Sequence, residues 1–207
     1  MPESTIDLAK LFQTVTKAMS ENKESLNEAD SYNQNHGDNM VQIFDTISKA
    51  VGKKKKSDAG TAFDYASKAL KKTQSSGSAK VYAEGLSRAA ETFKSKQVTQ
   101  ENALDLIQSL LGGGAGQASG GDLLGSLLGG LGAGEPSPQT SDDGLDMGDL
   151  ISAGKAFMQS QQQGGSAFES IIQAVISGGE LGGSTHRAKS GELVGNTLMK
   201  VLGALGR

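Results

Sequence analysis

Apolar residues recur at three- and four-residue intervals along most of the chain, which is the spacing of one face of an α-helix. No segment alternates apolar and polar residues in the way a half-buried strand does. The sequence therefore predicts an all-α fold, an antiparallel helical barrel or bundle of about eight helices. The predicted helices cover residues 5–19, 40–51, 58–70, 79–93, 99–111, 145–158, 166–176 and 193–205, and a shorter helical piece covers 22–29.

The helical pattern is interrupted by a glycine-rich segment of low complexity over residues 112–144. Glycine loses more conformational freedom on folding than any other residue, so such a segment is typical of a flexible insertion. A short helix over 123–131 is compatible with the leucines there. We expect residues 1–207 to form a single helical domain that carries this insertion.

The composition of the chain narrows the classes of function. The net charge is −3, which argues against nucleic acid as a partner because nucleic-acid binding requires a basic surface. The chain has no cysteine, so disulfides and thiolate metal sites are excluded. The sequence shows no signal-peptide pattern and no apolar run long enough to span a membrane, which predicts a cytoplasmic protein without a membrane span.

The polar stretch 30–40 is the first candidate for a site. It separates two predicted helices, and its Asn, Asp and Gly residues are also common in ordinary turns. Gly37 allows a tight turn, and His36 is one of only two histidines in the chain. The carboxylate and amide oxygens suit a hard cation such as Mg²⁺. These oxygens belong to Asp30, Asn33, Asn35, Asp38 and Asn39.

Two further polar stretches cover residues 75–80 and 184–192. Alternate loops of an antiparallel bundle lie at the same end, so we expect the three stretches to converge. Together they supply cation ligands, a helix N-terminus and basic side chains, which can hold the phosphates of a nucleotide through a metal ion. The lysine run 53–56 is interpreted as a solvated loop, and contact with an anion or a partner is the alternative.

The order of these stretches resembles the nucleotide-binding (DhaL-type) domain of dihydroxyacetone kinases, which also occurs in bacterial fatty-acid kinases. The family motif LN-x-LD, followed by GD-x-D-H-G-x-NM, is similar to Leu26–Asp30 and Tyr32–Met40. The motif GG-x-SG-x-LYG is similar to Ser75–Ala83. The later L-x-PA motif is similar to Leu150–Ala153, and the closing T-x-x-x-A-R-x-GR motif to Thr185–Glu192.

The resemblance implies an eight-helix barrel that binds ATP and magnesium at one rim. It places Mg²⁺ on Asp30, Asn33, Asn35 and Asp38. It places the nucleotide, ATP or ADP, on His36, Asn39, Ser76, Gly77, Ser78 and Lys189. The sequence departs from the family motifs at the positions that would hold the phosphates. Two of the family's three metal-binding aspartates correspond to Asn33 and Asn35. Its phosphate-contacting arginine corresponds to Glu192, and its double glycine corresponds to Ser75-Ser76. An asparagine carbonyl brings no charge to a cation, so these changes weaken a magnesium site.

Two hypotheses of function follow from the resemblance. In the first, the chain is a catalytically degenerate binding or interaction module that encloses an apolar or lipid ligand among its helices. In the second, it is an active ATP- and Mg-dependent phosphotransferase that works with a separate acceptor-type kinase subunit. A third possibility is a plain helical bundle, in which the three polar stretches lie at unrelated places.

Overall fold

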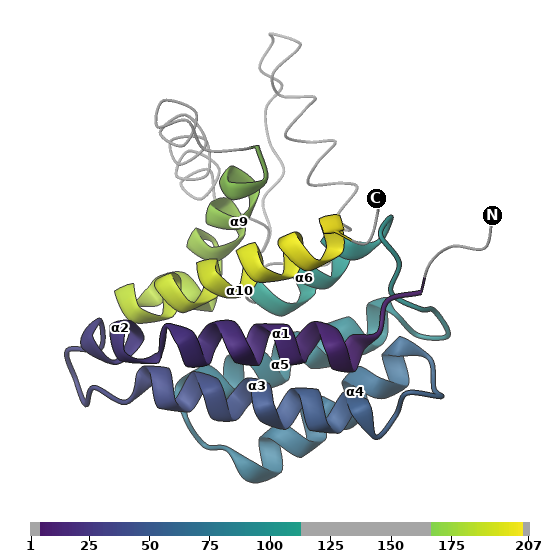
Figure 1. Cartoon of the computed structure of the whole chain (residues 1–207), viewed down its shortest axis with the longest axis horizontal. Helices are drawn as coiled ribbons and strands as arrows, with labels where there is room; N and C mark the ends of the chain where they lie inside the picture. The colour runs from purple at the N-terminus through teal and green to yellow at the C-terminus, as the bar shows by residue number, and fades with distance from the viewer. Residues whose placement is uncertain (1–4, 113–166, 205–207) are drawn as a thin grey trace, which may run out of the picture.

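The computed structural model describes residues 5–112 and 167–204, and these ranges contain helices and no strand. The predicted all-α class is thereby confirmed, and the helices pack as a bundle (Figure 1). The predicted insertion over 112–144, apart from Gly112, and the predicted helix over 145–158 lie outside the described residues. The elements are α1 (Leu8–Glu21), α2 (Lys23–Glu28), α3 (His36–Gly52), α4 (Ala59–Thr73), α5 (Gly77–Thr92), α6 (Ala103–Leu111), α9 (Ala167–Ser177), the 3₁₀ helix η1 (Glu180–Gly183) and α10 (Thr185–Ala204).

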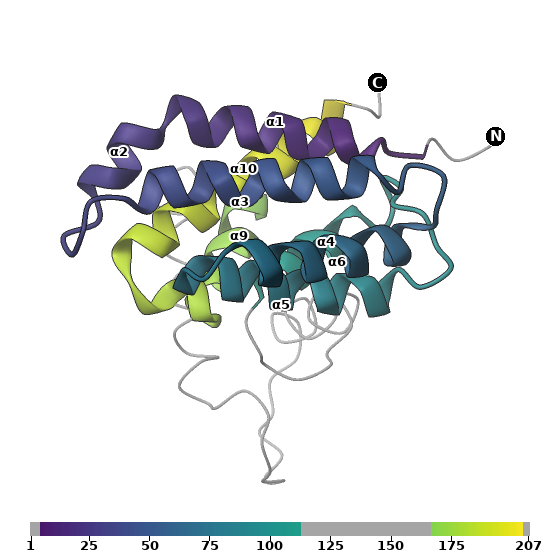
Figure 2. The same ribbon diagram turned by 90° about the horizontal axis from the view of Figure 1, so that it is seen from below.

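Consecutive helices pack side by side in opposite directions. Helix α3 returns along α1, and α5 returns along α4, so both pairs are antiparallel (Figures 1 and 2). Helix α10 packs along α1 on the side away from α3, and α6 packs on α5 (Figure 1). As a consequence, the first turns of α3 and α5 lie at one end of the bundle, and their last turns lie at the other end.

Side-chain caps fix the beginning of three helices. Asp7, Asp58 and Ser76 each accept a hydrogen bond from a backbone N–H three residues further on. Such caps satisfy N–H groups that have no partner within the helix. Helix α1 begins after Asp7, three residues later than the predicted start at residue 5, and α4 begins at Ala59, next to its predicted start at residue 58.

Three other helices also begin elsewhere than predicted. Helix α6 starts after Asn102, whose side chain accepts a hydrogen bond from the backbone N–H of Thr99, where the helix was predicted to begin. Helix α3 starts at His36 and not at Met40. Helix α10 starts at Thr185, so most of the predicted polar loop 184–192 is helical. The inward-facing residues in the first part of α10 are polar, so the apolar periodicity does not reveal that this part is helical.

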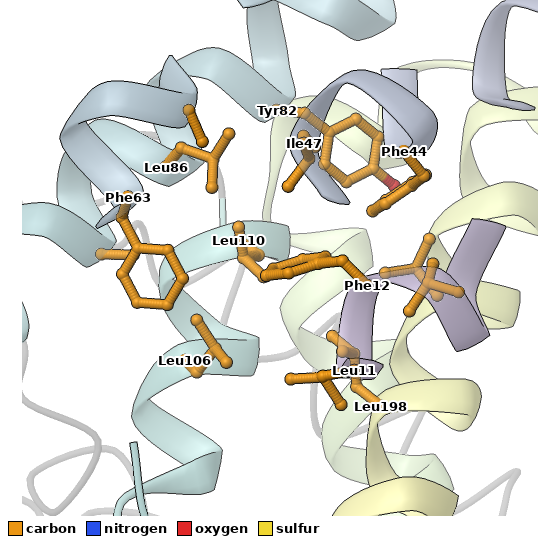
Figure 3. Packing of buried hydrophobic residues seen from close by; sticks show 14 of the residues in the cluster. Leu11, Phe12, Phe44, Ile47, Phe63, Tyr82, Leu86, Leu106, Leu110 and Leu198 are labelled. Carbon is orange, nitrogen blue, oxygen red and sulfur yellow. The ribbon is translucent and has the colours of Figure 1, made fainter. Parts of the chain in front are cut away.

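The core is built around a chain of aromatic rings (Figure 3). Phe12 lies 6.4 Å from both Phe44 and Phe63, measured between ring centroids. Tyr82 continues the chain beyond Phe44 at 5.0 Å, and Phe93 continues it beyond Phe63 at 5.7 Å. All five side chains are buried, so the centre of the described bundle is filled by the protein's own residues. Among the helices of the described ranges, none has the combination of length and apolar character needed to cross a membrane.

Candidate functional site

The three polar stretches singled out in the sequence come together at one end of the bundle. Helices α3, α5 and α10 all begin at this end, and Figure 1 shows the first turns of α10 beside α2. The side chains that meet here form what we call the polar cluster. Its members are Asp30, His36, His186, Arg187 and Ser190.

His36 and Ser190 connect α3 to α10 inside the protein. The His36 Nε2 atom lies 2.9 Å from the Ser190 hydroxyl, which in turn donates to the carbonyl of Arg187 at 2.9 Å. The two histidine rings contact each other edge to face, with 4.6 Å between the centroids of His36 and His186. Both His36 and Ser190 are buried. The first turn of α10 is therefore held against the first turn of α3 by polar contacts.

Burial lowers the pKa of His36 to about 4, and electrostatic repulsion from His186 and Arg187 acts in the same direction. The negative charge of Asp30 opposes this shift without reversing it. His36 is consequently neutral at pH 7. A neutral imidazole has one donor nitrogen and one acceptor nitrogen, so it can accept a hydrogen bond from a hydroxyl or a ligand.

Asp30 places one carboxylate in the polar cluster. Its Oδ1 atom accepts a hydrogen bond from the N–H of Tyr32 at 3.1 Å and lies 3.9 Å from Nδ1 of His186. Burial raises the pKa of Asp30, but the backbone N–H groups of Tyr32, Asn33 and Asn35 and the electrostatic effect of His186 together lower it by more, so the net direction is downward. The side chain is thus an ionised carboxylate at neutral pH.

Arg187 brings a positive charge into the polar cluster. No carboxylate of the described ranges lies within ion-pair distance of its guanidinium. Its Nε atom is buried and has no hydrogen-bond partner in the described part of the chain. The guanidinium lies against Gly77, in the space that a Cβ atom on this residue would occupy. Gly77 at the start of α5 therefore makes room for Arg187 from α10.

The remaining predicted metal ligands lie outside the polar cluster. Asn33 and Asn35 are exposed in the turn before α3, and the Asn33 side chain accepts a 3.4 Å hydrogen bond from the N–H of Asn35. Gln34 between them has a φ of 54°, a left-handed conformation that helps to reverse the chain. Asn39 donates to the Asn35 side-chain oxygen at 2.7 Å.

Asp38 takes part in a network that joins α3 to α2. Its Oδ2 atom accepts from Asn27 at 2.9 Å, and its Oδ1 atom lies 3.3 Å from the Lys23 ammonium group. The Asn27 carbonyl also accepts from the backbone N–H groups of Gly37 and Asp38. These contacts occupy both oxygens of the Asp38 carboxylate. Within the described ranges, no group of three or more His, Asp or Glu side chains is placed to hold a metal ion.

The predicted nucleotide contacts on α5 lie beside the polar cluster, and Lys189 lies further away. Ser76 caps α5, Gly77 contacts Arg187, and Ser78 is buried in the first turn. Lys189 donates to the hydroxyl of Ser25 at 2.8 Å, on the side of α10 that faces α2. A small pocket of about 220 Å³ opens there, lined by Asn22, Ser25, Leu26, Lys189, Glu192, Leu193 and Asn196.

Sequence reasoning assigned no individual role to His186, Arg187 or Ser190. They lie within the stretch 184–192, which was interpreted as a loop, and a loop gives no information on which side chains share a face. Treated as a helix, the stretch places His186 and Ser190 four residues apart and hence on one face. That spacing was the available signal.

A scan of the chain against models of known protein families gave no match. Searches among curated proteins and among solved structures likewise gave no match.

Proposed function

We propose that this protein is a non-catalytic binding module that holds a phosphate-bearing ligand, such as a nucleotide, at the polar cluster. The observation that carries the proposal is the guanidinium of Arg187, which meets the first turns of α3 and α5 and has no acidic partner in the described ranges. A cation beside helix N-termini attracts an anion, because each N-terminus carries a partial positive charge.

Hydrogen-bond donors for an anion are available at the start of α5. The backbone N–H groups of Gly77 and Ser78 have no acceptor in the described part of the chain, whereas Ser76 caps the N–H of Ala79. At α3 the corresponding N–H groups are already bound by Asn27. We therefore assign the phosphate contacts to the first turn of α5 and to Arg187, and not to the turn over residues 30–35.

The proposed binding does not depend on a metal ion. The positive charge that neutralises a phosphate would come from Arg187 and the helix termini, and these same groups repel a divalent cation. Asp38, one of the two carboxylates expected to bind magnesium, is already engaged by Lys23 and Asn27. The resemblance to the dihydroxyacetone kinase domain supports a nucleotide as the ligand, and the filled aromatic core argues against an apolar or lipid ligand among the described helices.

Calorimetric titration with inorganic phosphate and with ATP, each with EDTA or with magnesium, tests this proposal. We expect saturable binding in EDTA, and we expect Arg187→Gln to weaken it by about tenfold or more, the contribution of a charge-assisted hydrogen bond. Lys80→Gln is the matched control, because it removes one exposed positive charge from the first turns of α5. No binding of either ligand at millimolar concentration would overturn the proposal.

The second candidate is an active ATP- and Mg-dependent phosphotransferase with a separate acceptor subunit. The presence of the ionised Asp30 in the polar cluster favours it, since a carboxylate there can hold a magnesium ion that bridges the phosphates. This candidate predicts ATP binding that requires magnesium and is lost in Asp30→Asn. Metal-independent binding that Asp30→Asn leaves intact supports the non-catalytic module instead.

A further inference from the structure

The end of the bundle opposite the polar cluster carries two lysine-rich loops that are held against each other. The loop 53–57 connects α3 to α4, and the loop 93–97 follows α5. Figure 2 shows both loops beyond the same ends of these helices. The backbone N–H of Ala59 donates to the carbonyl of Lys96 at 2.9 Å, which fixes one loop on the other. We call the six lysines of these loops the lysine end: Lys53, Lys54, Lys55, Lys56, Lys94 and Lys96.

The acidic residue between the two loops does not neutralise these lysines. The Asp58 carboxylate accepts hydrogen bonds from the N–H and hydroxyl of Thr61 and from the N–H of Ser95, so it ties the loops together. Lys55 pairs with Asp7 at 3.2 Å. Lys54 lies over the ring of Tyr65, with 4.9 Å between its Nζ atom and the ring centroid.

Five members of the lysine end have no acidic partner in the described ranges, namely Lys54, which lies over the ring of Tyr65, and four exposed lysines. Lys53, Lys56, Lys94 and Lys96 are exposed, and no carboxylate of the described ranges lies within 4.0 Å of their ammonium groups. The whole chain nevertheless has a net charge of −3. The lysine end is thus a basic patch on a chain whose other residues are acidic in sum.

We propose that the lysine end docks on the surface of an anionic lipid bilayer. Clusters of four to eight basic residues next to a membrane anchor or on an amphipathic helix bind acidic lipid headgroups, and each lysine or arginine near the surface contributes about 1 kcal/mol. The lysine end has a similar number of lysines on one face. A flat surface that touches only this end attracts the lysines and stays away from the acidic remainder of the protein. The polar cluster, at the opposite end, then faces the solvent.

The composition of the lysine end favours lipid over nucleic acid. It contains no arginine, and the partly exposed ring of Tyr65 on α4, which lies next to it, has Lys54 over one face. Recognition of single-stranded nucleic acid uses aromatic rings on which bases stack, and arginine is common at such sites. Large exposed apolar side chains in the described ranges are limited to Tyr32 and Tyr65, so we expect contact with the bilayer to be electrostatic and sensitive to salt.

Co-sedimentation with lipid vesicles tests the proposal. The vesicles contain phosphatidylcholine alone or with about one-third phosphatidylserine, at about 25 mM and about 300 mM salt. One variant replaces Lys53, Lys56, Lys94 and Lys96 by Gln. The control replaces Lys17, Lys68, Lys71 and Lys72 by Gln, which changes the net charge equally at exposed sites on α1 and α4.

We expect the wild type and the control to bind the acidic vesicles at low salt, and the lysine-end variant to bind at least about tenfold more weakly. Binding should be lost at high salt and on vesicles of phosphatidylcholine alone. Equal binding of the two variants, or no binding of the wild type at low salt, would overturn the proposal. So would tighter binding to a single-stranded oligonucleotide than to the acidic vesicles at the same salt.

Discussion

His36 Nε2 and the hydroxyl of Ser190 lie 2.9 Å apart, although 154 positions separate the two residues in the chain. The contact joins the first turn of α3 to the first part of α10 across the segment that the structure does not describe. Because both residues are buried, the loss of either partner leaves a polar group away from water. The contact therefore contributes both to the fold and to the geometry of the polar cluster.

The first prediction concerns the Ser190 hydroxyl. Ser190→Ala removes the hydrogen-bond partner of His36, and we expect the free energy of unfolding to fall by about 1–2 kcal/mol. Urea denaturation at pH 7 measures this change. Ser20→Ala, an exposed serine on α1, is the control and should leave the stability unchanged. Equal stabilities of the two variants would show that the Ser190 contact contributes nothing.

The second prediction is a dependence of stability on pH that arises from His36. The pKa of His36 is about 4 in the folded protein, whereas its ordinary value, which applies to the unfolded chain, is 6.5. Between pH 4 and pH 6.5 the unfolded chain therefore binds more protons than the folded protein. Stability is then highest above pH 6.5 and falls as the pH decreases toward 4. We expect His36 to account for a loss of about 2 kcal/mol between pH 7 and pH 5.

The variant His36→Gln isolates this effect, because glutamine does not titrate. Urea denaturation of both proteins at several pH values should give a smaller loss of stability toward pH 5 in the variant. The comparison uses the slope and not the absolute stability, so a general destabilisation by the substitution does not affect it. Parallel slopes in the two proteins would contradict the prediction.

The third prediction tests the contact between Gly77 and Arg187. A Cβ atom at position 77 occupies the place of the guanidinium, whose flexible end then moves aside. We expect Gly77→Ala to weaken phosphate binding by about tenfold. The free energy of unfolding should stay unchanged, because the Arg187 side chain can move away from the new methyl group and alanine favours a helix. Gly183→Ala has open space around the added methyl group and is the control for calorimetry.

Much of the fold followed from the apolar pattern, because the core residues of α1, α3, α4 and α5 repeat at helical spacing. Helix α10 is the instructive exception. In the first part of α10, Ser190 and His186 both face inward and contact His36. A helix whose inward face is polar lacks apolar periodicity, so its sequence resembles that of a loop. The helix was therefore predicted to begin at residue 193, eight positions after its actual start.

The candidate site was predictable in its location and not in its composition. The antiparallel order of the helices predicted that the polar stretches converge. The contact between His36 and His186 and the contact between Gly77 and Arg187 confirm this. The pairing of Asp38 with Lys23 depends on the packing of α2 against α3, which no local pattern contains. The lack of an ion pair for Arg187 within the described ranges likewise depends on which acids lie nearby in space.

The fourth prediction concerns the close approach of α2 and α3. A Cβ atom on Gly37 would overlap the backbone carbonyl oxygen of Lys23, and a backbone atom cannot move without shifting the helix. We expect Gly37→Ala to lower the free energy of unfolding by about 1–3 kcal/mol. Gly52→Ala on the same helix is the control, since the nearest atom to its added methyl group is 3.7 Å away. Equal unfolding midpoints in urea for the two variants would contradict this reading of the contact.

The fifth prediction concerns the hydroxyl group of Tyr82. Its side chain is fully buried, and its oxygen has no hydrogen-bond partner in the described part of the chain. Burial alone raises the pKa of this phenol, so the group is neutral at pH 7. A buried hydroxyl without a partner costs free energy that its removal recovers.

We therefore expect Tyr82→Phe to raise the free energy of unfolding by about 1 kcal/mol, while the ring keeps its contact with Phe44, 5.0 Å away between centroids. Tyr65→Phe, at a partly exposed position, serves as the control and should have no effect. Urea denaturation at pH 7 measures both. A loss of stability in Tyr82→Phe would contradict the prediction, because it would mean that the hydroxyl has a hydrogen-bond partner in the folded protein.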